Sequence, residues 1–107
     1  MEQDKVYTNP GLTMNDLTDY MEIPTYQLSQ LINQVFGKGF NEFVNFYRVE
    51  EVKRLLNNQS FSHLTIEALS EEAGFNSKSS FYSAFKKQTG TTPIAFQKQS
   101  DLSEFAN

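Results

Sequence analysis

Apolar residues recur every three or four positions through most of this chain, which is the spacing of amphipathic helices. The apolar faces comprise Met14, Leu17 and Met21; Leu28, Leu31, Ile32, Val35 and Phe36; Phe43, Val44, Tyr47, Val52, Leu55 and Leu56; Ile66, Leu69 and Ala73; and Phe81, Ala84 and Phe85. No stretch shows the apolar–polar alternation of a half-buried strand. We therefore predict an all-α fold of about seven helices.

Capping residues mark where the first of these helices begin and end. Thr13 followed by Asp16 has the spacing of a capping box at a helix start. Pro24 ends that helix, Thr25 is placed to cap the next one, and Gly37 is placed to end it. The sequence thus predicts two short helices separated by a tight turn.

The same arrangement occurs twice along the chain. Residues 12–18 match residues 64–70 at an offset of 52. After the turn Gly37 aligns with Gly90, and the offset becomes 53, so the second copy has one extra residue in its turn. Two copies are too few for a solenoid, which needs three or more. The repeat indicates a tandem pair of helix-turn-helix units.

The second copy has its own turn and capping signals. Gly74 permits the turn, and Ser77 is placed to cap a helix that runs from residue 78 to about 89. Gly90 is placed to stop that helix, and Thr92-Pro93 can begin another, with proline at the tolerated first position.

A long helix is predicted between the two copies, because residues 41–58 contain neither Gly nor Pro and carry a broad apolar face. This linker helix is expected to pack on both halves. We therefore predict one domain over residues 1–107, with helix-turn-helix units at 12–40 and 64–99.

Composition narrows the function classes. With no cysteine, disulfides, thiolate metal sites and cysteine catalysis are excluded. His63 is the only histidine, and a metal site needs several ligands, so we predict no metal, no cofactor and no catalytic residue. No apolar stretch approaches the roughly 20 residues that span a bilayer, and the start does not resemble a signal peptide. We expect a cytoplasmic, non-enzymatic protein whose segment makes no membrane contact.

The distribution of charge along the chain says more about possible binding partners than the net charge of −4 does. Two windows contain no acid: residues 23–41, which carry Lys38, and residues 73–100, whose four lysines are Lys78, Lys86, Lys87 and Lys98. Binding responds to the local field, so an acidic chain can still present a basic face. Chance is the alternative explanation for such windows.

The second helix of each unit has an outer face of uncharged hydrogen-bonding side chains. These are Tyr26, Gln27, Ser29, Gln30, Asn33 and Gln34 in the first unit, and Ser79, Ser80, Tyr82 and Ser83 beside three lysines in the second. Base edges in the major groove require such donors and acceptors, and a helix-turn-helix places its second helix there. A helical protein-interaction module of the same shape is the alternative.

Several segments resemble the AraC/XylS family of transcription regulators. They are GFNSKSSF at 74–81, FKK at 85–87, TGTTP at 89–93 and the linker segment at 48–56, and residues 12–43 resemble the family's first helix-turn-helix. The resemblance runs from about residue 12 to 97. It implies sequence-specific binding of double-stranded DNA to regulate transcription, with two recognition helices in successive major-groove segments.

The resemblance also assigns roles to individual residues. By position, the base contacts would be Tyr26, Ser29, Gln30, Asn33, Ser79, Ser80, Tyr82 and Ser83. The phosphate contacts would be Thr25, Lys38, Arg48, Asn76, Ser77, Lys78, Lys86 and Lys87. For Arg48 a second role is left open, that of tying the two halves together. Phosphate contacts set register, whereas base contacts set sequence preference.

One departure from the family affects the expected affinity. Gln30 and Ser83 stand where many members carry Arg, which lowers phosphate attraction and flattens the salt dependence. Since the second unit carries most of the positive charge, we expect that unit to anchor and the first to discriminate. The further partners implied are RNA polymerase and a second copy, joined through a sensing region outside this chain. The GFNSKSSF segment, together with the lead-in of Tyr7, Pro10 and Leu12, also resembles regulators with a membrane-anchored sensor, which is an alternative setting for this segment.

Overall fold

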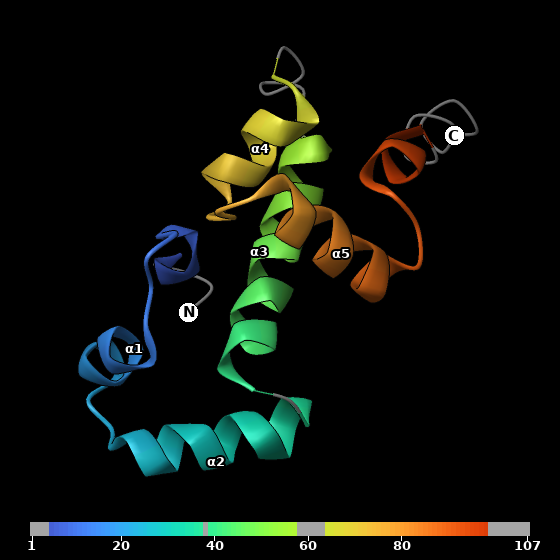
Figure 1. Cartoon of the computed structure of the whole chain (residues 1–107). Coiled ribbons are helices and arrows are strands. Elements are labelled where there is room, and N and C mark those ends of the chain that lie inside the picture. Colours follow the sequence, from blue (N-terminus) through green and yellow to red (C-terminus); the bar gives the residue numbers. More distant parts are fainter. Residues whose placement is uncertain (1–4, 38, 58–63, 99–107) are drawn as a thin grey trace.

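The computed structural model describes residues 5–37, 39–57 and 64–98, and these residues are largely helical (Figure 1). The elements are a 3-10 helix, η1 (Val6–Thr8), and five α-helices: α1 (Met14–Met21), α2 (Thr25–Phe36), α3 (Phe40–Leu56), α4 (Ile66–Glu72) and α5 (Lys78–Thr89). Residues 93–98 form a further helical segment, and none of the described residues is in a strand. The all-α prediction is confirmed, and the expected number of about seven helices is close.

The long helix α3 is the centre of the arrangement. In Figure 1 it stands upright, with α2 across its lower end and α4 and α5 beside its upper part. The predicted linker helix is confirmed, although it begins at Phe40 and ends at Leu56, rather than covering 41–58. Residues 58–63, which include His63, lie outside the described residues.

The first apolar cluster joins α1, α2 and the start of α3. Leu17, Leu28 and Ile32 are buried at its centre, as predicted. The prediction that Leu31 and Val35 belong to this core is wrong, because their side chains are 45% and 65% exposed. Among the described elements α2 packs mainly on α1 and α3, and these contacts leave the side chains of Leu31 and Val35 exposed.

The second cluster joins α3, α4 and α5. Ala73, Phe81 and Phe85 are buried in it, as predicted, together with Val49 and Val52 of α3. The rings of Phe81 and Phe85 meet edge to face with centroids 5.8 Å apart, a favourable aromatic geometry. Because this cluster and the first one both use α3, that helix fixes the placement of α2 and α5.

Most predicted helix ends are confirmed. Thr13 and Asp16 form a reciprocal capping box, and the Ser77 hydroxyl accepts from the backbone N–H of Ser80 at the start of α5. Gly90, with φ 79°, ends α5 in the left-handed region. The prediction that Thr25 caps α2 is wrong. Pro24 takes the cap position in extended backbone, and Thr25 is already the first helical residue.

The lead-in before α1 is built into the second half of the fold, which the sequence analysis did not anticipate. The Tyr7 ring stacks on Tyr47 of α3, with centroids 5.7 Å apart. Gly74, with φ 107°, lets the turn between α4 and α5 approach this segment closely, since a Cβ there would lie 2.5 Å from the Tyr7 carbonyl oxygen. The lead-in therefore contacts the turn that precedes α5.

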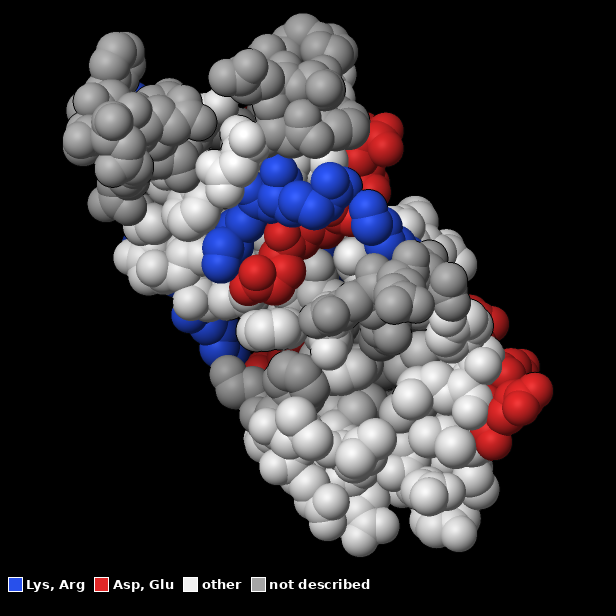
Figure 2. Space-filling view, turned by 180° about the vertical axis from the view of Figure 1, so that it is seen from behind, with Lys and Arg blue, Asp and Glu red and all other residues white. Residues whose placement is uncertain are grey.

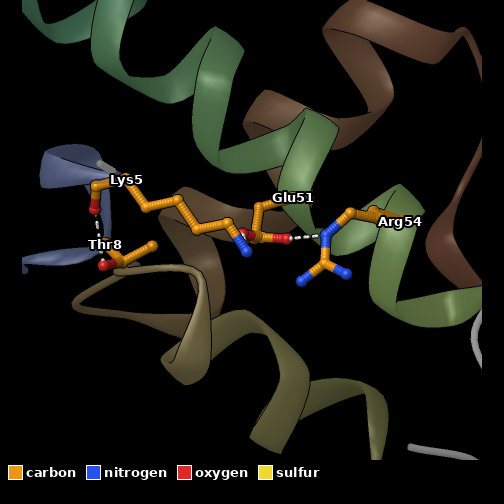
Figure 3. Close-up of polar contacts among 4 residues, drawn as sticks. All are labelled: Lys5, Thr8, Glu51 and Arg54. Atoms are coloured by element: carbon orange, nitrogen blue, oxygen red, sulfur yellow. Dashed lines mark hydrogen bonds and ion pairs between the residues drawn. The ribbon is translucent and has the colours of Figure 1, made fainter. Parts of the chain in front are cut away.

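A buried carboxylate also ties the lead-in to α3. Glu51 pairs with Lys5 at 3.1 Å and with Arg54 one turn further along α3 (Figure 3). Burial alone would raise the pKa of Glu51, but hydrogen bonds and charge from Arg54 and Lys5 outweigh it and hold that pKa below its usual value. Glu51 therefore stays ionised, with its charge compensated.

Candidate nucleic-acid interface

The outer face of α2 is uncharged and exposed to solvent. Thr25, Tyr26, Gln30 and Asn33 are exposed, and the Tyr26 side chain is 75% exposed. Ser29 is half-buried on the flank of the helix. Of the first unit's predicted contacts, only Lys38 lies outside the described residues. The geometry thus brings five predicted contact residues together on a single helix.

The outer face of α5 carries hydroxyl groups near its beginning and lysines near its end. Ser79, Ser80 and Ser83 are exposed, as are Lys86 and Lys87. Ser77 stands directly before the helix, and its hydroxyl is engaged in capping. Its side chain also donates to the hydroxyl of Ser80 at 2.9 Å. The start of α5 is therefore well ordered by local hydrogen bonds.

Tyr82 lies against α4, away from the three serines. Its hydroxyl donates to Glu67 at 3.1 Å, and its half-buried ring packs on the second cluster. Burial raises the pKa of Tyr82, and the hydrogen bond to Glu67 raises it further. Lys78 also reaches Glu67, at 3.4 Å. Two predicted DNA contacts thus share one intramolecular carboxylate.

The lysines of α5 differ in how far their charge is compensated. Lys87 pairs with Glu42 in the first turn of α3, at 3.1 Å. Lys86 has no ion-pair partner among the residues that the structure describes. Sequence reasoning missed Glu42 because 45 residues separate it from Lys87, and no local signal connects the two positions.

Arg48 and Asn76 are occupied within the protein. Arg48 is buried, and its Nε and Nη2 donate to the carbonyl oxygens of Tyr7 and Asn9 at 2.7 and 2.9 Å. Asn76 donates to the carbonyl oxygen of Pro10 at 2.9 Å. Burial lowers the pKa of Arg48. Of the two roles left open for Arg48, these bonds support the structural one, in which it holds the lead-in against α3.

A cleft of about 400 Å³ separates α5 from the first half of α3. Its walls are formed by Glu42, Asn45, Phe46, Ser80, Ser83, Ala84, Lys87 and Gln88. Ser80 and Ser83 therefore open onto the same space as the Glu42–Lys87 ion pair. Within the described residues, no group of three His, Cys, Asp or Glu side chains could hold a metal ion.

The charged side chains are distributed unevenly over the surface. Figure 2 shows Lys and Arg gathered in the upper half of one face, with carboxylates among and beside them. The lower end, where α2 lies in Figure 1, is white in this view because α2 contains no charged residue. Among the described residues, no helix is both long and apolar enough to span a bilayer.

Comparison with known proteins gives one family match that covers most of the chain. Residues 17–99 match a family model described as a helix-turn-helix domain. The chain is 32% identical over 90 residues to the melibiose operon regulatory protein of Escherichia coli. This match covers 84% of this chain and 29% of that protein. The chain is 28% identical over 93 residues to the regulatory protein PocR of Salmonella typhimurium, covering 87% of this chain and 30% of that protein. The chain thus spans less than a third of these relatives.

Solved structures agree with the family match. The C-terminal domain of AraT, a response regulator from Geobacillus stearothermophilus, superposes with a TM-score of 0.71 and 26% identity, covering 89% of this chain and 76% of that one. The C-terminal domain of the two-component response regulator yesN from Fusobacterium nucleatum gives a TM-score of 0.69 at 26% identity, with 88% of each chain covered. The fold and the sequence therefore lead to the same group of proteins.

Proposed function

Because this chain belongs to the AraC-type helix-turn-helix family and is thus a DNA-binding domain of transcription regulators, we propose that it binds operator DNA with α2 and α5. The two helices enter successive major-groove segments on one side of the duplex. Such segments lie about 34–36 Å apart, a distance that α3 must hold between the two helices.

The observation that carries this proposal is the pair of outer faces on α2 and α5. Both helices have 12 residues, and both stand on α3 with their uncharged polar side chains exposed. Outer faces of soluble helices carry charged and polar residues, whereas α2 carries no charge at all and α5 carries hydroxyl groups beside its three lysines. Amides and hydroxyls at these positions suit the donors and acceptors of base edges.

The proposal assigns base contacts and phosphate contacts to different residues of the two units. Base contacts come from Tyr26, Ser29, Gln30 and Asn33 on α2, and from Ser79, Ser80 and Ser83 on α5. Phosphate contacts come from Thr25, Ser77, Lys78, Lys86 and Lys87. Since α5 holds these lysines and α2 holds no charge, the second unit anchors the protein and the first selects the sequence.

The relatives suggest the setting in which such a domain acts. The protein named for the melibiose operon is a regulator more than three times as long as the aligned segment. We propose that this domain works in the cytoplasm beside RNA polymerase. A second copy, held through a region outside this chain, would add the affinity that a sparsely charged single domain lacks.

A salt titration tests the proposal. The affinity of the full chain for a random-sequence duplex is measured by fluorescence anisotropy at increasing salt. We expect log K to fall with log salt, with a slope of about −0.9 for each phosphate contact. Lys86→Ala should weaken binding to all sequences and reduce the slope by about 1. Absence of binding at low salt, or a slope of zero, would instead support the interaction-module alternative.

A further inference from the structure

We infer that α2 reads an A·T-rich half-site and that Leu31 contacts the 5-methyl group of a thymine within it. This inference rests on the proposed function, because it assigns a base preference to a helix that the proposal places in the major groove.

Three glutamines form an exposed stripe along α2. Gln27, Gln30 and Gln34 are separated by three and four residues, so they lie on one side of the helix, and all three are exposed. Asn33 stands beside them and is exposed too. Amides of Gln and Asn bond adenine bidentately through N6 and N7.

The residues that would read the other bases are missing from α2. Guanine is read chiefly by Arg or Lys, and the N4 donor of cytosine by Glu or Asp. The helix, whose sequence is TYQLSQLINQVF, contains none of these four residue types. The chemistry of this face therefore favours adenine over guanine and cytosine.

Leu31 adds an apolar group at the edge of the amide stripe. It comes four residues after Gln27 and three before Gln34, and its side chain is 45% exposed, although the adjacent Ile32 is buried. Thymine carries the one methyl group among the major-groove base edges, and aliphatic side chains contact it. An amide on adenine and a leucine on the methyl group of thymine both select A·T pairs.

Val35 provides a matched control on the same helix. It is 65% exposed, but it comes seven residues after the buried Leu28, so it points to the core side of α2, off the stripe. A valine that faces away from the groove should not sense a thymine methyl group.

Selection from a random DNA pool with the full chain, followed by base replacement, tests the inference. Gln30→Ala identifies the half-site of α2, because preference should relax there by about 5- to 150-fold per lost bidentate contact. We expect those positions to be A·T pairs. Replacing their thymines by uracil, which lacks only the methyl group, should weaken binding about fourfold. The thymine–uracil ratio should fall towards one in Leu31→Ala and remain unchanged in Val35→Ala.

The possible failures are distinguishable. If no sequence is enriched and random duplexes do not bind at low salt, both the proposed function and this inference are overturned. If a sequence is enriched but the positions sensitive to Gln30→Ala are G·C pairs, the proposed function stands and the inference is wrong. Equal binding of thymine and uracil duplexes by the unmodified chain refutes the role of Leu31, whatever the folding of the variants.

Discussion

Replacing Gly74 by alanine tests how tightly the lead-in is built into the domain. The added Cβ would lie 2.5 Å from the carbonyl oxygen of Tyr7, and 2.9 Å from both the carbonyl carbon of Thr8 and Nε of Arg48. Two of these three atoms belong to the backbone, so no side-chain rotation relieves the overlap. Either the lead-in or the turn before α5 must move.

Two energetic costs add in Gly74→Ala. At φ 107° the backbone is strained for a residue with a Cβ, which costs about 1–3 kcal/mol. Moving the lead-in weakens the hydrogen bonds that the Arg48 guanidinium donates to it, and such a bond to a charged group contributes about 1.5–3 kcal/mol. We expect the free energy of unfolding to fall by about 3–5 kcal/mol, a large part of a typical domain's stability.

Gly90→Ala is the matched control, since Gly90 has φ 79° but nothing within 4 Å of its Cβ position. That change should cost only backbone strain, about 1–2 kcal/mol. Urea unfolding followed by circular dichroism measures both variants, and a slope of about 1–3 kcal/mol per molar urea converts midpoints to free energies. Gly74→Ala should lose about 2 kcal/mol more than Gly90→Ala. Equal losses would show that the lead-in does not press on this turn.

Three further changes probe the cap, the buried carboxylate and the charge of the interface. Ser77→Ala removes the cap of α5 and should cost about 1 kcal/mol in thermal unfolding, whereas Ser83→Ala in mid-helix should cost little; equal effects would argue against the cap. The pKa of Glu51 is lower in the folded protein than in the unfolded chain. The stabilisation that its ionised carboxylate provides is therefore fully present above the pKa of the unfolded chain, and it is lost as the pH falls through the pKa of the folded protein. In Glu51→Gln the free energy of unfolding should therefore depend less on pH under acidic conditions. The same pH dependence in the variant and the unmodified chain would contradict this expectation. Glu42→Gln removes the carboxylate that pairs with Lys87 and should steepen the salt slope of random-duplex binding by up to about 0.9. Asp19→Asn, with the same charge change on α1, should leave the slope unchanged, and equal slopes in the two variants would refute the effect of the Glu42–Lys87 pair.

Features that depend on a few neighbouring residues could be predicted from the sequence. The capping box at Thr13 and Asp16, the cap at Ser77 and the stop at Gly90 all follow from interactions within four residues. The exception is Thr25, where a proline one position earlier was already able to take the cap position. Burial of Phe81 followed from periodicity, because α5 packs on two other helices.

Features that depend on distant neighbours could not be predicted in this way. Leu31 fits the helical apolar period, but whether it is buried depends on whether another element covers that flank of α2. Arg48 stands in a segment that could have faced DNA, and its hydrogen bonds go to carbonyl groups 39 and 41 residues earlier. Backbone carbonyl groups carry no residue identity, so no side-chain pattern indicates them as partners.

The charge of α5 shows why spatial neighbours matter for function. Residues 73–100 contain no acid, yet Glu67 and Glu42 reach Lys78 and Lys87 at 3.4 and 3.1 Å from other helices. A phosphate that binds either lysine must displace a carboxylate, and a lysine already neutralised holds fewer counterions to release. General affinity should therefore be lower than the number of lysines suggests. If α2 reads bases as we propose, its uncharged side chains should then provide a larger share of specific binding, and the preference of its amides and of Leu31 should weigh more in operator choice.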